Sequence, residues 1–195
     1  REKRAFGKIL GSVHGLEGII RGDFRDLGAI SPSTWTRIAQ TPGAALGTTR
    51  RKMRPEEVSQ VLQILSDGRI GFLFTIGGND SAGTAHSLGM AAGQAGYSLT
   101  VMNIPKTIDN DLVLTDHSPG YGSAARFVAL ATMGAGRDAE AMGRESPITL
   151  IEVMGRDSGW LAASAALAKR DERDAPHMIC LPEVPVEEER FLGLM

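Results

Sequence analysis

The stretch Ile70–Ser81, IGFLFTIGGNDS, decides the fold class, because it carries a strand, a tight turn and the start of a helix in succession. Ile70–Ile76 is a short apolar run, which is typical of a strand buried on both faces of a parallel sheet. Gly77–Ser81 predicts the turn, and the small residues that follow predict a helix as far as about Ala95.

Strand and helix signals alternate on both sides of this unit. Strands are expected at Lys8–Val13, Ser98–Asn103, Ile148–Val153 and His177–Leu181. Helices are expected through Ala39, with Ser33 or Ser31 as the cap, and at Pro55–Gly68, Ser123–Met133 and Trp160–Lys169. Within the second of these helices, one apolar stripe at helical spacing is formed by Val58, Val61, Leu62 and Leu65. The alternation predicts an α/β fold with a mostly parallel sheet. Pro105–Gly122 lacks both signals, and long segments of this kind are usually functional or disordered.

The composition excludes several classes of protein. The 195 residues are 42% hydrophobic and 23% charged, as in an ordinary globular protein, and no apolar stretch reaches the length of a membrane span. The formal net charge of −2 argues against a nucleic-acid surface, which needs a clustered basic excess. The single cysteine, Cys180, excludes a disulfide within the chain, fits a reducing cytosol and is expected to be buried in its strand. The four histidines show no metal-ligand spacing, so no zinc is expected.

The turn Gly77–Ser81 is a candidate phosphate site. Two glycines after a strand let successive N–H groups at a helix start face outward, which suits a phosphate. Taken alone, the pattern is equally compatible with close packing at the turn. Asp80 is unusual there, because a carboxylate repels phosphate unless a metal ion lies between them.

A second polar group, PKTIDND at Pro105–Asp111, follows the next expected strand. Ligands of open α/β sheets bind at the carboxyl ends of strands, and here a lysine, a hydroxyl and two carboxylates lie close together in the sequence. In an extended segment Asp109 and Asp111 would lie on the same side, so one could act as general base while the other orients it or holds a metal. The alternative is a turn with solvated charges.

Two further loops carry an arginine among small residues. Val153–Gly159, VMGRDSG, leads from an expected strand into a helix, and Arg156 offers paired donors for a phosphoryl group or sugar hydroxyls. The alternative pairs Arg156 with Asp157 or Glu152. Gly47–Arg50, GTTR, suits the capture of an anion, and its alternative is a solvated, exposed loop.

In this order the motifs resemble those of the phosphofructokinase family over nearly the whole chain. The matching segments are Gly47–Arg50, Gly77–Ser81, Pro105–Asp111, Thr115–Ala125 and Glu152–Gly159. The most specific are Thr-Ile-Asp-Asn-Asp at 107–111 and Met-Gly-Arg at 154–156. The resemblance implies a three-layer α/β sandwich with a phosphoryl-donor domain, residues 1–124, and the start of a fructose 6-phosphate domain, residues 125–195. The active site would lie in the cleft between them.

The resemblance also implies phosphoryl transfer to the 1-hydroxyl of fructose 6-phosphate, a step of glycolysis that gives fructose 1,6-bisphosphate. Asp109 would be the base that takes the hydroxyl proton, and Thr107 would contact the sugar or the transferred phosphoryl group. Lys106 would stabilise the charge on a departing phosphate. Asp111 would support a Mg²⁺ site with Asn79, which stands where the family usually has aspartate and contributes less charge.

The remaining implied roles are in binding. Fructose 6-phosphate would be held by Thr107, Ile108, Asp109, Met154, Gly155 and Arg156. The donor would be held by Arg50, Gly78, Asp80, Ser81 and Lys106. At two of these positions ATP enzymes of the family tend to have glycine, whereas pyrophosphate enzymes tend to have the aspartate and lysine found here. A carboxylate at Asp80 would also crowd and repel an ATP α-phosphate, so the resemblance favours inorganic pyrophosphate as donor.

The chain is expected to be an internal portion of a longer parent protein and to be inactive alone. It begins with Arg1 rather than Met, and its last expected helix, Glu187–Met195, carries no ending signal. The family's first glycine-rich phosphate loop would lie upstream. Members of the family are usually dimers or tetramers, and a cytoplasmic homo-oligomer is expected.

Two alternatives to a pyrophosphate-dependent enzyme stay open. One is an ATP-dependent 6-phosphofructokinase, or the same fold acting on another acceptor. The other is a non-catalytic phosphosugar-binding or regulatory homologue, for which Asn79 is an argument. NAD kinases and lipid kinases share a similar glycine loop but lack the Met-Gly-Arg turn, so residues 154–156 argue against them.

Overall fold

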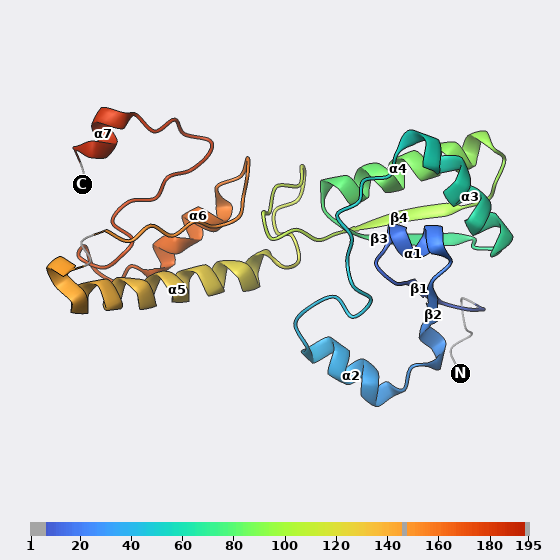
Figure 1. Cartoon of the computed structure of the whole chain (residues 1–195), viewed down its shortest axis with the longest axis horizontal. Coiled ribbons are helices and arrows are strands. Elements are labelled where there is room, and N and C mark those ends of the chain that lie inside the picture. The colour runs from blue at the N-terminus through green and yellow to red at the C-terminus, as the bar shows by residue number, and fades with distance from the viewer. Residues whose placement is uncertain (1–6, 146–147, 194–195) are drawn as a thin grey trace. The chain divides into compact units, whose positions relative to one another are not determined.

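The computed structural model describes residues 7–145 and 148–193, which form two compact units (Figure 1). Unit 1 comprises the described part of residues 1–75 and 80–103, and unit 2 the described part of residues 76–79 and 104–195. These units are defined by packing. The expected boundary near residue 124 separates domains by the ligand they hold, and it stays a prediction.

Unit 1 opens with a small antiparallel pair of strands, of which the sequence patterns indicated the first and not the second. Its first elements are β1 (Leu10–Ser12), α1 (Leu16–Arg21), β2 (Phe24–Asp26), η1 (Leu27–Ala29) and α2 (Pro32–Gln40). Leu10 lies opposite Asp26 and Ser12 opposite Phe24. The strand expected near Lys8–Val13 is confirmed by β1. The helix expected through Ala39 is also confirmed, and of its two candidate caps it is Ser31 whose Oγ accepts the Thr34 N–H, at 3.2 Å, and caps α2.

The core of unit 1 gathers around α3 (Val58–Asp67), which follows the short 3₁₀ helix η2 (Pro55–Glu57). The predicted apolar stripe is confirmed: Val61, Leu62 and Leu65 are buried. They pack in one cluster with residues of α1 and of the helix α4 (Asn79–Gln94), namely Leu16, Ile19, Leu88 and Ala92. Burial of these side chains is the main force that holds α1, α3 and α4 together.

The strand–turn–helix unit folds as predicted and continues into a parallel partner strand. β3 (Phe72–Gly77) is followed by α4 and then by β4 (Thr100–Pro105). Gly71 O accepts the Thr100 N–H at 2.9 Å and Gly77 O accepts the Lys106 N–H at 3.0 Å. Because both partners advance by six residues, the two strands run parallel. The α/β class is confirmed, and the strands of the described residues form two two-stranded sheets, β1–β2 and β3–β4.

The expectation that β3 is buried on both faces is wrong. Leu73 packs against the core cluster, whereas Phe72 and Phe74 on the opposite face remain about half exposed, at 49% and 47%. The alternation arises because the helices of unit 1 pack on one face of the strand pair. A continuous apolar run identifies a strand but does not show how many of its faces are covered.

Unit 2 is built on the long helix α5 (Tyr121–Met142), with α6 (Trp160–Ser164) and the 3₁₀ turn η4 (Ala165–Ala168) lying along it (Figure 1). Their buried residues are Ala125, Val128, Thr132, Leu161, Ser164 and Ala168. Both predicted helices of this region are thereby confirmed. Two short elements complete the unit, η3 (Gly143–Glu145) and α7 (Glu188–Leu192). No helix within residues 7–145 and 148–193 combines the length and apolarity needed to cross a membrane.

Two strands expected in unit 2 do not form. Residues 148–153 and 177–181 carry no strand, and among the described residues no backbone ladder pairs with either segment. Leu150 is 83% exposed, and Cys180, expected to be buried, is exposed as well. An apolar run supplies suitable side chains, but a strand exists only where a neighbour takes up its N–H and C=O groups. The end of the last expected helix, residues 194–195, lies outside the described residues.

Candidate active site

The loop after β4 is a turn rather than an extended segment, so the assumption that places Asp109 and Asp111 on the same side is wrong. Thr107 Oγ1 accepts the Asp109 N–H at 3.2 Å, and Asn110 adopts a left-handed backbone with φ of 54°. A residue with positive φ reverses the local chain direction, which interrupts the alternation of a strand. The two carboxylates therefore have separate surroundings.

The glycine turn and the Lys106–Asp111 loop lie together in unit 2, as expected for the carboxyl ends of neighbouring parallel strands. The Lys106 N–H donates to Gly77 O, and a Cβ added to Gly78 would lie 3.6 Å from Thr107 Cβ. At the start of α4, Asn79 Nδ2 donates to Asp111 Oδ2 at 3.2 Å. Polar groups from two motifs thus share one place in the fold.

Asp109 carries a carboxylate oxygen that the described residues leave free. Its Oδ1 is buried and has no hydrogen-bond partner within residues 7–145 and 148–193. A buried carboxylate oxygen without a partner is costly, and such a group calls for an explanation, of which a catalytic role is one. A turn with solvated charges therefore describes Asp111, which is exposed, but not Oδ1 of Asp109.

The Val153–Gly159 turn is joined directly to the Asp109 loop. Ser158 is buried, and its Oγ donates to the backbone oxygen of Asp109 at 2.9 Å. At the end of the turn the Gly159 N–H donates to Glu183 Oε1 at 2.7 Å. Gly155 has φ of 123°, and an added Cβ would overlap the Ser158 oxygen, so glycine is required there.

Arg156 is exposed, and in the described part of the chain it forms no ion pair with Asp157 or Glu152. The local ion pair that would have explained this arginine without a ligand is therefore absent from the described residues. Met154, its neighbour in the motif, is 56% exposed. The turn thus presents a cation and an apolar side chain to solvent, as a binding loop for an anionic ligand would.

In unit 1 the loop that carries Arg50 rests on His14. The His14 Nδ1 lies 3.3 Å from Thr48 O, and the His14 N–H donates to Leu46 O at 2.7 Å. Gly47 has φ of 73°, and an added Cβ would overlap the imidazole ring. Glycine at 47 is therefore demanded twice, by backbone conformation and by space.

Replacing Gly47 by alanine is expected to displace the Arg50 loop and raise the KM for the phosphoryl donor in the parent protein by about tenfold, about the worth of one displaced charged hydrogen bond. Steady-state kinetics at varied donor concentration measures it. Gly43→Ala is the control, because Gly43 also has positive φ, 120°, but no atom lies within 4 Å of its added Cβ. Equal donor KM values for the two variants would show that the His14 contact does not position the loop.

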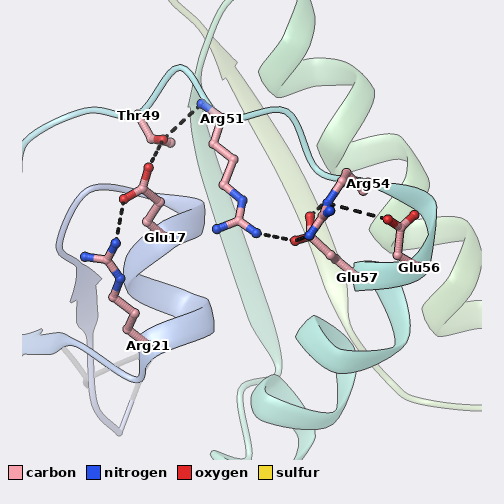
Figure 2. A network of polar contacts seen from close by, with 7 residues as sticks. All are labelled: Glu17, Arg21, Thr49, Arg51, Arg54, Glu56 and Glu57. Atoms are coloured by element: carbon pink, nitrogen blue, oxygen red, sulfur yellow. Dashed lines mark hydrogen bonds and ion pairs between the residues drawn. The ribbon is translucent and has the colours of Figure 1, made fainter.

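A network of charged groups fixes the segment after Arg50 (Figure 2). Thr49 Oγ1 donates to Glu17 Oε1 at 3.0 Å and accepts the Arg51 N–H at 3.0 Å. Glu57, whose carboxylate is buried, binds both Arg51 and Arg54, the latter at 2.9 Å. Figure 2 shows the Arg51 and Arg54 side chains converging on that carboxylate.

The network leaves Arg50 as a cation available for a ligand. Arg51 and Arg54 are bound to Glu57, and Lys52 Nζ lies 3.1 Å from Asp80 Oδ1. Within the described ranges, Arg50 is exposed and takes part in no ion pair. Because the neighbouring cations are already neutralised and Arg50 is not, the loop fits anion binding better than the alternative of an exposed, solvated loop without a ligand.

The Glu57 network predicts a pH-dependent contribution to stability. The hydrogen bond from the Arg54 side chain, followed by that from the Arg54 N–H, lowers the pKa of Glu57 from 4.5 to about 2. A carboxyl whose pKa is lowered on folding stabilises the fold above its unfolded pKa, and the contribution is lost as pH falls from 4.5 toward about 2. Glu57→Gln is therefore expected to flatten the pH dependence of the urea unfolding midpoint in that window. Glu56→Gln, at an exposed neighbour, is the control, and equal slopes for both variants would contradict the prediction.

Few groups here could hold a metal. No cluster of three or more histidine, cysteine, aspartate or glutamate side chains suited to a metal occurs in the described residues. Asn79 and Asp111 lie within hydrogen-bond distance and together supply one amide and one carboxylate. That is the kind of oxygen set through which proteins bind Mg²⁺, which usually takes its remaining ligands from water and substrate phosphates.

The predicted residues fall into two groups. Unit 2 holds Gly78, Asn79, Lys106, Thr107, Ile108, Asp109, Asp111, Met154, Gly155 and Arg156, whereas unit 1 holds Arg50, Asp80 and Ser81. A cavity of about 840 Å³ in unit 2 is lined by other residues, among them Ile148, Leu150, Ile179 and Phe191. Its lining is more apolar than polar, and the lining cation Arg137 is already paired with Glu140 and Asp174, so the polar loops are the better candidate for a phosphorylated ligand.

Four residues near these loops escaped the sequence analysis as contributors: Lys52, Asn110, Ser158 and Glu183. Two of them act over long sequence separations, from Ser158 to Asp109 and from Glu183 to Gly159. No local spacing signals such contacts. Asn110 did carry a signal, because an asparagine flanked by two aspartates in a loop is a frequent choice for a left-handed backbone.

Comparison with known proteins shows which family has a sequence similar to this chain. The family Phosphofructokinase matches residues 2–193. The pyrophosphate–fructose 6-phosphate 1-phosphotransferases of Rhodospirillum rubrum and Xanthomonas campestris are 41% and 39% identical over 99% and 95% of the chain. The chain spans 47% and 46% of their lengths, so it corresponds to about half of these relatives.

A solved structure shows the same fold. The crystal structure of pyrophosphate-dependent phosphofructokinase from Marinobacter aquaeolei matches with a TM-score of 0.85 and 35% identity, over 97% of this chain and 48% of that one. The α/β fold inferred from the alternation of elements is thereby that of a solved phosphofructokinase. The family match of this chain covers almost every residue and includes each of the loops described above. This chain belongs to the phosphofructokinase family.

Proposed function

We propose that the parent protein transfers a phosphoryl group from inorganic pyrophosphate to the 1-hydroxyl of fructose 6-phosphate, reversibly giving fructose 1,6-bisphosphate. The observation that carries the proposal is the buried, unpartnered Oδ1 of Asp109 among the described residues. It lies in a loop that also carries Lys106 and Asp111. Relatives named pyrophosphate–fructose 6-phosphate 1-phosphotransferase support the choice of substrates.

Asp109 acts as the general base in this proposal. Its free carboxylate oxygen accepts the proton of the sugar 1-hydroxyl while the hydroxyl oxygen of the sugar attacks the phosphorus atom. Thr107 is held against the same loop by its bond with the Asp109 N–H and contacts the sugar or the transferred group. Arg156, exposed on the turn that Ser158 joins to Asp109, binds the sugar phosphate with Met154, Gly155 and Ile108.

Donor choice rests on Asp80 and Lys106. A pyrophosphate ends where ATP continues into its α-phosphate and nucleoside, so a carboxylate at that point penalises ATP alone. Lys52, 3.1 Å from Asp80, offsets part of the carboxylate charge. Lys106 stabilises the departing phosphate, and Arg50, Gly78 and Ser81 hold the donor.

Mg²⁺ completes the proposed site. Asn79 and Asp111 would hold it, because their side chains meet at 3.2 Å and offer the oxygen ligands that Mg²⁺ prefers. When bound, Mg²⁺ neutralises charge on phosphate oxygens, which is the main demand of phosphoryl transfer. Because Asn79 contributes less charge than a carboxylate, we expect the site to bind Mg²⁺ more weakly and to fill only at a higher Mg²⁺ concentration.

The test is turnover by the purified parent protein with fructose 6-phosphate and either donor. Formation of fructose 1,6-bisphosphate with pyrophosphate supports the proposal, and turnover with ATP alone rejects it. Sugar-phosphate binding by calorimetry without turnover with any donor would instead identify a regulatory homologue. The remaining parts of the proposal are a cytosolic location and a dimeric or tetrameric assembly. Equilibrium sedimentation of the same preparation measures the assembly.

A further inference from the structure

Asn110 separates the two carboxylates of the Lys106–Asp111 loop and is held in a rare conformation. Its φ is 54°, in the left-handed region, and only 5% of its surface is exposed. Glycine, asparagine and aspartate adopt this conformation at the lowest cost. Burying a polar side chain and adopting this backbone both cost free energy, and the contacts of the Asn110 side chain offset that cost.

The Asn110 side chain closes the segment that follows it. Its Oδ1 accepts the Ser118 N–H at 2.7 Å, and its Nδ2 donates to Asp116 O at 3.2 Å. Ser118 is fully buried, and Gly120, two residues further on, forms a bridge with Thr107. One amide therefore ties residues 116 and 118 back to the loop, and it uses its donor group and its acceptor group at once.

The aim of Asp109 depends on this backbone. Hydrogen bonds hold its peptide group on both sides, from its N–H to Thr107 Oγ1 and from Ser158 Oγ to its backbone oxygen. Its Oδ1, however, has no partner in the described residues. With no contact to hold it, Oδ1 depends on the conformation of the main chain that carries the side chain. Asn110 sets that conformation at the next residue.

We propose that Asn110 is a positioning residue that holds Asp109 in its productive orientation through the left-handed backbone and the two-bond clamp. The inference rests on the proposed function, in which Asp109 is the base. Neither of the other residues suited to this backbone can replace it fully. Glycine keeps the conformation but supplies no clamp, and aspartate can accept from Ser118 but cannot, when ionised, donate to Asp116.

The experiment compares Asn110→Gly and Asn110→Asp with the wild-type parent protein. For Asn110→Gly we expect kcat to fall on the order of 10–100-fold while the KM for fructose 6-phosphate changes less than about threefold, because misplacement of a reacting group acts on the chemical step. Asn110→Asp, which keeps one of the two bonds, should lie between. Arg69→Gly is the control, because exposed Arg69 has φ of 53° in unit 1, and its kcat should match the wild type.

Each outcome decides the inference. Asn110→Gly with wild-type kcat per folded molecule overturns it, as does a loss confined to KM or to thermal stability. If Asn110→Gly does not fold, Asn110→Asp decides in the same way, and a wild-type kcat for that variant overturns it. The comparison uses whichever donor the wild type accepts, so an ATP-dependent wild type rejects the proposed donor alone. A wild type without any turnover rejects both the proposed function and this inference.

Discussion

Replacing Asp109 by asparagine is expected to lower kcat of the parent protein by about 10²–10⁴-fold, the usual range for loss of a general base. The amide has nearly the shape of the carboxylate but cannot take the proton of the sugar hydroxyl. Because Thr107 and Ser158 bond to the backbone of Asp109, the loop should keep its conformation. The KM for fructose 6-phosphate should therefore change little, and steady-state kinetics at saturating donor measures both quantities.

Asp138→Asn provides the matched control for this variant. Asp138 is exposed on α5, and its replacement removes the same charge without touching the loop. Its kcat should equal that of the wild type. Loss of a base typically lowers kcat by more than about tenfold. If Asp109→Asn kept more than about a tenth of the wild-type kcat, Asp109 would not be the base. Calorimetry with fructose 6-phosphate would confirm that the variant still binds the sugar.

Converting Asp80 and Lys106 to glycine together is expected to lower turnover with pyrophosphate by about 10²–10³-fold, as for loss of one group that stabilises developing charge. The ratio of ATP to pyrophosphate turnover should rise. Removal of the Asp80 carboxylate takes away the repulsion toward an α-phosphate and also releases Lys52, now 3.1 Å from it, to bind that phosphate. Kinetics with both donors measure kcat/KM for each.

Two single variants divide this effect into its causes. Asp80→Asn keeps the size of the side chain and removes its charge, so it separates repulsion from crowding. Lys106→Gly alone should weaken pyrophosphate turnover without improving ATP use. A double variant whose ATP to pyrophosphate ratio stays at the wild-type value would contradict the assigned role of both residues, whichever donor the wild type prefers.

Those features of the fold that local spacing determines could be predicted from the sequence. The buried stripe of α3, the serine cap of α2, for which Ser33 and Ser31 were both candidates, and the turn before α4 each depend on residues a few positions apart. The segments at 148–153 and 177–181 were predicted wrongly for the opposite reason. Their conformation depends on a hydrogen-bonding neighbour, which an apolar pattern in one segment does not encode.

The candidate site divides in the same way. That residues 77–79 meet residues 106–111 followed from the rule that ligands bind at the carboxyl ends of parallel strands, and the Lys106–Gly77 and Asn79–Asp111 bonds show the contact. The clamp on Ser118 and the buried Glu57 network depend on the path of irregular chain, for which sequence offers no period. A left-handed residue such as Asn110 is the point at which the simple alternation of an extended chain fails.

The hydroxyl of Ser158 has a practical consequence for engineering. Because it donates a hydrogen bond to the main chain of Asp109, 49 positions away in the sequence, a shift of the turn that carries Arg156 is expected to shift the proposed base as well. Libraries that randomise residues 154–157 to admit other sugars should therefore leave Ser158 unchanged. Otherwise, variants chosen for a new acceptor will also be variants with a displaced base, and their poor rates will be mistaken for poor recognition.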